Sequence, residues 1–322
     1  MTTRRNLIAG LAVAASLAFV PVTAIAQGDP ITMVVPYSAG GPVDGLTRLI
    51  AEGLSRKTGQ TYLVENKPGA NGIIGAQYVA STRTPQNTLF VGGTGPISVN
   101  LLTRKGLPFK AEDFKPVSLV AHGPMALTVP ASAEYNDLDG FLAAAKASEN
   151  PFRFGTFGPG SLSQLYGALL NRELGFEMTE VAYKTTADEL KDMIGGQIDF
   201  TVSSPFGVIG QIRSGDLKML AVASEERIPQ LPEVPTFAEL GRPQLTGSFW
   251  TGIFAPAEMD DAQVQAISAA IDEVLKEERT VEFLSNIAQF PVGGTPDELQ
   301  KQLDQDREVW GAIVKERGIE LQ

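Results

Sequence analysis

The sequence has no cysteine and only one histidine among its 322 residues. A chain without cysteine forms no disulfide, offers no thiolate nucleophile and carries no lipid on a cysteine at a cleaved terminus. The chain has no Gly-x-Ser-x-Gly motif, which would supply the serine that His122 needs in a serine hydrolase. The paired histidines of common zinc motifs are missing as well. We therefore expect no metal site and interpret His122 as a polar residue near a strand or hinge.

Positive charge is also scarce. The chain has 26 lysines and arginines against 37 acidic residues, which gives a formal net charge of −11. We expect no nucleic-acid partner, because that affinity comes from basic side chains that neutralise phosphates. An anionic ligand would gain nothing from long-range attraction and would need local hydrogen-bond donors.

Glycine is plentiful, but the nucleotide-binding fingerprints are missing. The glycine-containing segments 38–41, 69–75 and 92–95 have neither the Gly-x-Gly-x-x-Gly spacing nor a following Lys-Ser or Lys-Thr. We expect no nucleotide and no other cofactor.

The first 26 residues have the pattern of a secretory signal peptide. Arg4 and Arg5 precede an apolar stretch at 7–20, and Ala24-Ile25-Ala26 is a small-x-small cleavage site. The stretch is short for a membrane span and no second one follows. We predict cleavage near Ala26 and a soluble periplasmic protein, exported by either the general or the twin-arginine route.

Strand-like and helix-like segments alternate along the rest of the chain. Apolar runs predict strands at 31–35, 61–64, 88–91, 117–120, 125–129, 152–155, 180–183, 198–202, 217–222 and 249–254. Helical periodicity covers 43–57, 72–81, 137–147, 161–173, 185–194, 205–213, 260–277, 279–288 and 296–316. This order predicts an α/β protein with mostly parallel sheets, whose ligand lies beyond the carboxyl ends of the strands.

Two glycine loops join a predicted strand to a predicted helix. The loop at 36–44 reads Pro-Tyr-Ser-Ala-Gly-Gly-Pro-Val-Asp, and the loop at 155–161 reads Gly-Thr-Phe-Gly-Pro-Gly-Ser. Glycine lets the backbone approach a ligand, and the first turn of a helix has free N–H groups that bind anions. If the loops lie in two lobes, they can hold one anion from both sides. The alternative is two plain turns, with Ser161 only capping its helix.

Several further segments resemble one family. They are Val-Glu-Asn-Lys-Pro-Gly-Ala-Asn-Gly at 64–72, Tyr-Lys at 183–184 followed by Gly-Gly-Gln-Ile-Asp at 195–199, the stretch 220–239 with Leu-Pro-Glu-Val-Pro-Thr-Phe-Ala-Glu, Trp-Thr-Gly-Ile-Phe-Ala-Pro at 250–256, and the end from 310 to 319. Together with the loop at 36–44, their order resembles the extracytoplasmic solute receptors of tripartite tricarboxylate transporters, the Bug receptors.

The resemblance implies a type II periplasmic binding protein fold, in which two α/β lobes are joined by two crossing strands with the ligand cleft between them. Lobe 1 is expected at 27–125 and 247–322, lobe 2 at 126–246, and the crossing strands near 117–129 and 247–255. The implied function is capture of a small carboxylate for membrane permease subunits, with a dicarboxylate and an aromatic carboxylate as the two alternatives. A monomer without enzymatic activity is implied as well.

The candidate ligand-binding residues come from the two loops and from the matched segments. They are Tyr37, Ser38, Ala39, Gly40, Gly41, Val43, Asp44, Thr94, Thr156, Phe157, Gly158, Ser161, Ser163, Tyr183 and Ser203. Asp44 would repel an anion, so we expect it to cap the first helix or hold a water.

Two residues depart from the pattern of the family. Ser203 stands where many members have an aspartate, which disfavours an amino-acid ligand. Phe157 stands where a small residue is more usual, and it could form an aromatic wall with Tyr37 and Phe206. Alternatively, Phe157 packs between the lobes without touching the ligand.

Two other functions remain open from the sequence. The chain could be an orphan receptor that passes its signal to a membrane sensor through the same cleft. It could also be a periplasmic enzyme acting on organic acids, with Asp44 or Asp199 as its general base.

Overall fold

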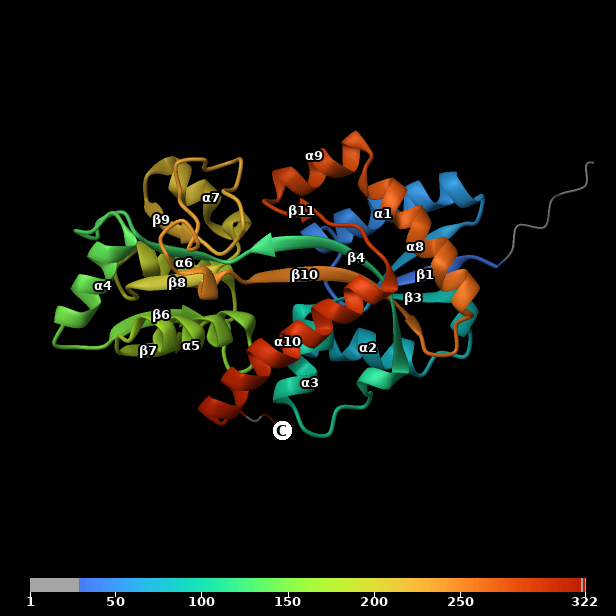
Figure 1. Cartoon of the computed structure of the whole chain (residues 1–322), viewed down its shortest axis with the longest axis horizontal. Helices are drawn as coiled ribbons and strands as arrows, with labels where there is room; N and C mark the ends of the chain where they lie inside the picture. The colour runs from blue at the N-terminus through green and yellow to red at the C-terminus, as the bar shows by residue number, and fades with distance from the viewer. Residues whose placement is uncertain (1–28, 320, 322) are drawn as a thin grey trace, which may run out of the picture.

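The computed structural model describes residues 29–319 and residue 321. Two β-sheets with helices on their faces form two lobes that lie side by side along the long axis of the molecule (Figure 1). The predicted signal peptide at 1–26 lies outside the described residues. Within the described part of the chain, no helix has the length and apolar character needed to cross a membrane.

The first sheet has six strands in the order β11-β4-β10-β3-β1-β2. They are β1 (Ile31–Val35), β2 (Tyr62–Asn66), β3 (Thr88–Gly93), β4 (Phe114–Pro124), β10 (Ser248–Pro256) and β11 (Phe290–Pro291). The helices of this lobe are α1 (Pro42–Thr58), α2 (Ile73–Ala80), the π-helical turn η3 (Thr94–Val99), α3 (Asn100–Thr103), α8 (Asp261–Leu275) and α9 (Glu278–Asn286).

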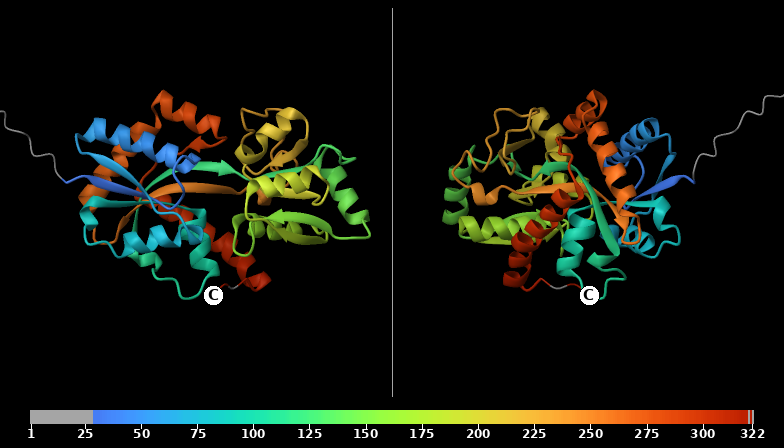
Figure 2. Two further views of the ribbon diagram at one scale, coloured as in Figure 1. Left: turned by 180° about the vertical axis from the view of Figure 1, so that it is seen from behind. Right: turned by 45° about the vertical axis from the view of Figure 1, so that its right-hand side comes forward.

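The second sheet has five strands in the order β7-β6-β8-β5-β9. They are β5 (Ala126–Pro130), β6 (Phe152–Thr156), β7 (Met178–Ala182), β8 (Phe200–Ser203) and β9 (Leu217–Val222). Its helices are α4 (Leu138–Ala147), α5 (Leu162–Leu174), α6 (Thr186–Ile194) and α7 (Pro205–Ser214). A last helix, α10 (Pro296–Arg317), runs across both lobes (Figures 1 and 2).

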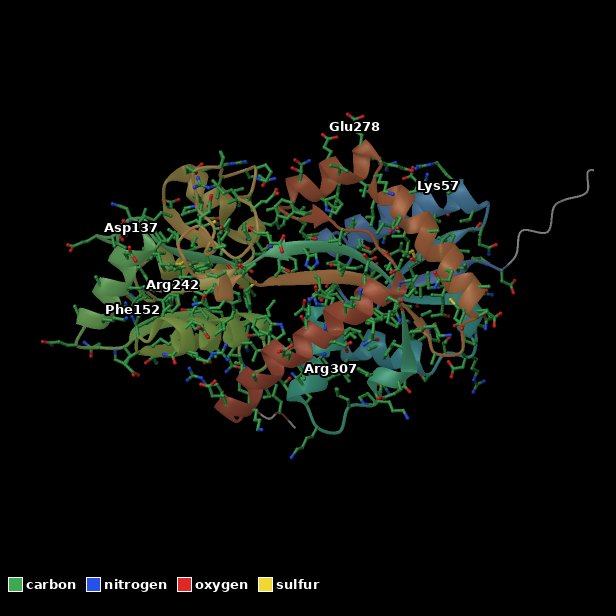
Figure 3. The ribbon with its side chains drawn as sticks, in the orientation of Figure 1. Lys57, Asp137, Phe152, Arg242, Glu278 and Arg307 are labelled. Carbon is green, nitrogen blue, oxygen red and sulfur yellow. The ribbon has the colours of Figure 1, made fainter. Side chains whose placement is uncertain are left out.

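Burial on both faces explains why four of the five residues of β1 are apolar. Ile31, Met33 and Val35 pack in a cluster with α1 and α8, whereas Val34 packs in a cluster on the opposite face with α2 and the first half of α10. Because successive strand residues point to opposite faces, a strand covered on both sides is apolar at most positions, and the exception in β1, Thr32, is only half-buried. Most charged side chains stay outside, as Lys57, Asp137, Glu278 and Arg307 illustrate (Figure 3), whereas Asp44, Glu189 and Asp306 are buried.

Both sheets are mixed, so the prediction of mostly parallel sheets was wrong. In the first sheet, β1 pairs in parallel with β2 and β3, whereas β10 pairs antiparallel with β3 and β4. In the second, β6 pairs in parallel with β7 and β8, whereas β5 pairs antiparallel with β8 and β9. The antiparallel pairs arise because strands that connect the lobes are inserted into each sheet.

The strands β4 and β10 form the ribbon that connects the lobes. They pair antiparallel, with Trp250 opposite His122 and Ser248 opposite Pro124. After Pro124 the chain enters β5 of the second sheet, and at Ser248 it returns. The lobe limits at 125–126 and 246–247 remain a prediction.

The helix α10 packs against both lobes. Leu299 and Leu303 belong to the apolar cluster around Phe90 of the first lobe, whereas Trp310 and Ile313 belong to the large cluster of the second. The rings of Trp310 and Tyr166 lie 6.2 Å apart between their centroids. The second half of α10 is therefore part of the core of the second lobe.

Candidate functional site

Four junctions between a strand and a helix meet between the lobes. The strands β1, β3, β6 and β8 end there, and α1, η3, α5 and α7 begin there. They surround a cavity of about 380 Å³. Its lining residues are Tyr37, Val43, Asn71, Gly92, Gly93, Thr94, Gly95, Met125, Phe157, Ser161, Leu162, Ser163, Val202, Ser203, Ser204, Phe249, Trp250 and Thr251. We call this cavity the cleft.

The loop before α1 is organised by a buried aspartate. Asp44 Oδ2 accepts hydrogen bonds from the backbone N–H of Gly40 (2.9 Å) and from Arg48 Nε (3.0 Å), and its Oδ1 accepts one from Asn66 Nδ2 (2.9 Å). The hydrogen bond from Arg48, aided by those from Gly40 and Asn66, holds the pKa of Asp44 at about 2. Gly40 has φ +83°, which suits glycine. Asp44 lies outside the cleft lining and shapes the loop beside it.

The loop before α5 is organised by hydroxyl groups. Ser161 caps the helix by accepting the N–H of Gln164 (3.3 Å), and its Oγ lies 3.1 Å from Ser163 Oγ. Ser163 Oγ also accepts the N–H of Phe157 (3.1 Å). The first N–H groups of α5 are left to face the cleft, where a helix terminus stabilises an anion.

A third helix begins at the cleft, at a junction from which the sequence predicted Ser203 but not Ser204 as a ligand-binding residue. Ser203 ends β8 and Ser204 precedes α7, which starts with Pro205. The hydroxyl of Ser203 is buried and has no hydrogen-bond partner among the described residues, although the residue lines the cleft. A buried hydroxyl without a partner is costly, so a ligand atom in the cleft would satisfy it.

The crossing strand β10 contributes the floor of the cleft. The backbone N–H of Trp250 donates to Thr94 Oγ1 (2.9 Å), which leaves the proton of that hydroxyl able to point at a ligand. The Cβ of any residue other than glycine at position 93 would lie 2.5 Å from the carbonyl oxygen of Trp250. The glycines that end β3 therefore allow this close approach.

Aromatic side chains from both lobes stand at the cleft in contact with solvent. Tyr37 of the first lobe is 37% exposed and Phe157 of the second is 42% exposed. Phe206 is similarly exposed at 44%, but it does not line the cleft, so the expected wall does not include it here. None of the described residues that line the cleft is acidic, basic or histidine.

The structure brings some of the candidate residues to the cleft and leaves others outside it. Those in the lining are Tyr37, Val43, Thr94, Phe157, Ser161, Ser163 and Ser203. Those outside the lining are Ser38, Ala39, Gly40, Gly41, Asp44, Thr156, Gly158 and Tyr183. Most of these lie within the same loops; Thr156 Oγ1, for instance, accepts the N–H of Gly158 (3.0 Å).

Tyr183 has a structural contact of its own. Its hydroxyl donates to Asp192 Oδ2 on α6 (2.9 Å), and burial together with Asp192 raises the pKa of Tyr183 to about 12. Lining residues that the sequence analysis missed include Asn71, Met125, Phe249 and Thr251.

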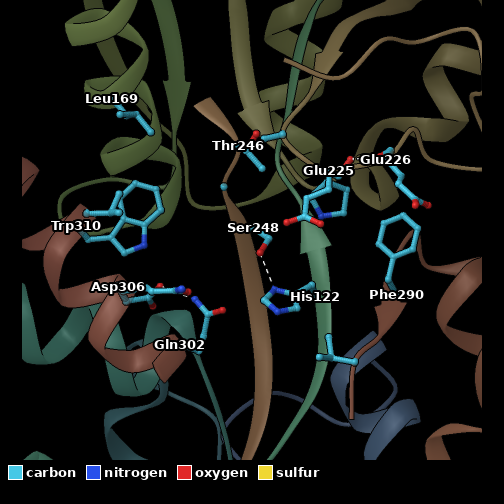
Figure 4. Close-up of a pocket in the computed structure, with 17 residues that line it drawn as sticks. His122, Leu169, Glu225, Glu226, Thr246, Ser248, Phe290, Gln302, Asp306 and Trp310 are labelled. Carbon is cyan, nitrogen blue, oxygen red and sulfur yellow. Dashed lines mark hydrogen bonds between the residues drawn. The ribbon is translucent and has the colours of Figure 1, made fainter. Parts of the chain in front are cut away.

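A larger cavity of about 780 Å³ lies on the other side of the β4–β10 ribbon (Figure 4). We call it the back cavity. His122 Nδ1 and Ser248 Oγ lie 2.7 Å apart on the ribbon, and burial lowers the pKa of His122. Asp306 on α10 and Phe290 on β11 line the same cavity (Figure 4). His122 thus lies on a crossing strand, as expected of a polar residue near a hinge.

The described residues contain no group of three or more histidines, cysteines, aspartates and glutamates that could hold a metal ion. The chemistry available at the cleft is therefore hydrogen bonding by backbone N–H groups, hydroxyls and helix termini, beside apolar walls.

Comparison with known proteins agrees with this geometry. The family model described as the tripartite tricarboxylate transporter family receptor matches residues 46–319. The chain belongs to this family. A relative, protein BugT of Bordetella pertussis, is 30% identical over 322 residues, which covers 99% of each chain.

Solved structures of similar receptors share the fold. The structure of Rpa4515 of R. palustris with adipate is 29% identical, covers 90% of this chain and 98% of its own, and has a TM-score of 0.78. MatC of Rhodopseudomonas palustris with bound malate is 28% identical, covers 88% and 98%, and has a TM-score of 0.73. This receptor has the type II periplasmic binding protein fold predicted from its sequence.

Proposed function

We propose that this receptor captures a small organic carboxylate between its lobes and delivers it to the membrane permease of a tripartite tricarboxylate transporter. One observation carries the proposal: helices α1, α5 and α7, which come from both lobes, all begin at the same cleft. Helix N-termini stabilise negative charge, so the cleft suits a carboxylate even though the chain is acidic. The relatives solved with adipate and with malate support this ligand class.

The cleft offers poor support for catalysis. Asp44 is ionised at neutral pH and engaged by Arg48, and it lies outside the lining. Asp199, the other candidate base, accepts hydrogen bonds from the backbone N–H of Arg153 (2.7 Å) and from its Nε (3.0 Å), and it too lies outside the lining. A general base must reach the proton that it removes, so we infer binding without turnover.

Thermal unfolding with a panel of ligands tests the proposed function. The panel holds aliphatic and aromatic carboxylates, amino acids and neutral sugars, and the protein is unfolded and refolded first to remove any ligand carried through purification. A ligand at one hundred times its Kd stabilises the folded state by about 2.7 kcal/mol. We expect carboxylates to raise the Tm and sugars to leave it unchanged. If no carboxylate raises the Tm, the proposal is wrong.

Recovery of the bound carboxylate tests the absence of turnover. After long incubation with the protein, mass spectrometry should show the ligand chemically unchanged. Transport itself is tested by deleting the gene and measuring uptake of the identified ligand into cells. Normal uptake with loss of a ligand-induced transcriptional response would support the sensor alternative.

A further inference from the structure

We propose that the ligand is an aromatic monocarboxylate, whose ring is held between Phe157 and Tyr37 while its carboxylate is held at the start of α5. This inference rests on the proposed function and narrows its ligand class. Both aromatic side chains line the cleft, one from each lobe, and both expose more than a third of their surface to solvent.

Exposed aromatic surface at the mouth of a binding cleft has a specific physical meaning. Large apolar side chains gain free energy when they leave water, and aromatic rings gain further from stacked or edge-to-face contact with another ring. The remaining apolar lining extends this surface around the cleft, through Val43, Met125, Leu162, Val202 and Phe249. A ligand with an apolar ring covers this surface, whereas a sugar acid or an amino acid would leave polar groups facing it.

The carboxylate is assigned to α5 because its first two N–H groups, those of Leu162 and Ser163, have no partner among the described residues, whereas the third, that of Gln164, is engaged by Ser161. Both α1 and α7 begin with a proline, Pro42 and Pro205, which has no N–H to donate. In the loop before α1, the N–H of Gly40 is already engaged by Asp44. In contrast, α5 begins with Leu162 and Ser163, which both line the cleft and both have an N–H.

The ring and the carboxylate subsites are held together by one hydrogen bond. Ser163 stands in the first turn of α5, and its Oγ accepts the backbone N–H of Phe157 at 3.1 Å. The position of Phe157 is therefore fixed relative to the helix terminus that binds the anion. A ligand whose ring is attached directly to its carboxylate can therefore contact both at once.

A second negative charge on the ligand would meet only the starts of α1 and α7, which begin with a proline and so have one N–H fewer than α5. The described lining has no lysine, arginine or histidine, so a second carboxylate would lose its hydration without an ion-pair partner. The unpartnered hydroxyl of Ser203 can instead satisfy one neutral polar group, such as a ring hydroxyl.

Calorimetric titration of the exported protein tests the inference with three probes: benzoate, cyclohexanecarboxylate and adipate. We expect benzoate to bind at least about tenfold more tightly than adipate, since one ring-sized contact accounts for such a factor. Cyclohexanecarboxylate should bind between the two, because it fills the same space without aromatic contact. Equal or tighter binding of adipate would overturn the inference.

Substitutions locate the ring. Phe157→Ala should weaken benzoate by about tenfold or more and change adipate by less than about twofold, and Phe157→Leu should fall between. The matched control is Ile194→Ala, which removes a similarly exposed apolar side chain outside the cleft lining and should leave both affinities unchanged. Thermal unfolding of each variant verifies folding.

The outcomes separate this inference from the proposed function. If adipate binds and benzoate does not, or if Phe157→Ala leaves benzoate unchanged, the carboxylate receptor stands and the aromatic ligand is refuted. If none of the three probes and no other carboxylate binds, both are refuted.

Discussion

The indole Nε1–H of Trp250 donates a hydrogen bond of 2.9 Å to Oδ2 of Asp306. This bond ties the crossing strand β10 to α10, the helix that packs on both lobes. The backbone N–H of the same tryptophan donates toward the cleft, to Thr94. Trp250 thus forms a hydrogen bond at the cleft through its main chain and one at the back cavity through its side chain.

The contact between Thr94 and Trp250 can be removed without changing side-chain volume. Thr94→Val leaves the buried N–H of Trp250 without an acceptor, which should lower the free energy of unfolding by about 1–3 kcal/mol. The variant should also weaken ligand binding, because the hydroxyl faces the cleft. Urea unfolding and calorimetry measure the two effects. Thr94→Ser is the control and should keep both values close to those of the parent chain; a stable Thr94→Val would contradict the assignment.

Asp44 should make the stability of the protein depend on pH in acid. Its pKa is about 2 in the folded protein, against 3.8 for an unperturbed aspartate, so the unfolded chain binds the proton more tightly. The ionised form therefore stabilises the fold above pH 3.8, and this contribution of about 2 kcal/mol is lost as the pH falls toward 2.

Asp44→Asn tests this pH dependence. Urea unfolding between pH 7 and 2.5 should show a smaller loss of stability for the variant than for the parent chain over the acidic part of the range. Glu149→Gln, at an exposed position outside the helices and strands, is the control for replacing a carboxylate by an amide. Identical profiles for the parent chain and Asp44→Asn would show that this carboxylate does not stabilise the fold.

The back cavity should influence the cleft through the hinge. The two cavities lie on opposite faces of one ribbon, so a rotation that narrows the cleft around a ligand widens the back. Phe290 packs against the apolar cluster of the second lobe, and Gln230 Nε2 donates to Ser285 Oγ (3.2 Å), so both contacts join the lobes. We expect closure of the cleft to stretch these contacts.

Phe290→Ala should therefore tighten ligand binding, although the residue lies far from the ligand. Without this contact, the open form is less stable relative to the closed form that holds the ligand. We therefore expect the Kd to fall by about two- to fivefold. Calorimetry measures the affinity, and small-angle scattering without ligand should show a more compact molecule. Val281→Ala, an exposed position on α9, is the control. Weaker binding by Phe290→Ala would show that the contact favours the closed form.

Ligand affinity should depend little on salt. No charged side chain among the described residues lines the cleft, so added salt has no ion pair to screen there. Between about 20 mM and 500 mM sodium chloride, the Kd should change by less than about twofold, and the association rate should rise because repulsion by the acidic surface is screened. Stopped-flow measurements give both quantities. A Kd that rises steeply with salt would indicate a cationic residue at the ligand.

The sequence predicted those parts of the site that local signals encode. The loops before α1 and α5 contain glycines and prolines between an apolar strand and an amphipathic helix, and both loops reach the cleft. The junction before α7 was predicted as a strand followed by a helix, but Ser203-Ser204-Pro205 has no glycine to mark a ligand loop. Its position beside the cleft depends on the order of strands in the second sheet.

Long-range pairing explains what the sequence could not predict. Whether Phe249 or Ser248 faces the cleft depends on which side of the ribbon the lobes enclose. The antiparallel position of β10 beside β3 joins segments more than one hundred and fifty residues apart, and no local pattern encodes that pairing. Tyr183 was chosen from a family motif, whereas its hydroxyl is engaged by Asp192.

The back cavity offers a way to watch the receptor at work. Val309 lines it on α10, 43% exposed, with the ribbon between it and the ligand. Because the chain has no cysteine, a cysteine introduced there would be its only thiol and would accept a single fluorophore. As the lobes close, the back cavity would widen and expose the dye to more water. Ligand binding would then change the fluorescence of the dye, while every group that touches the carboxylate stays unaltered.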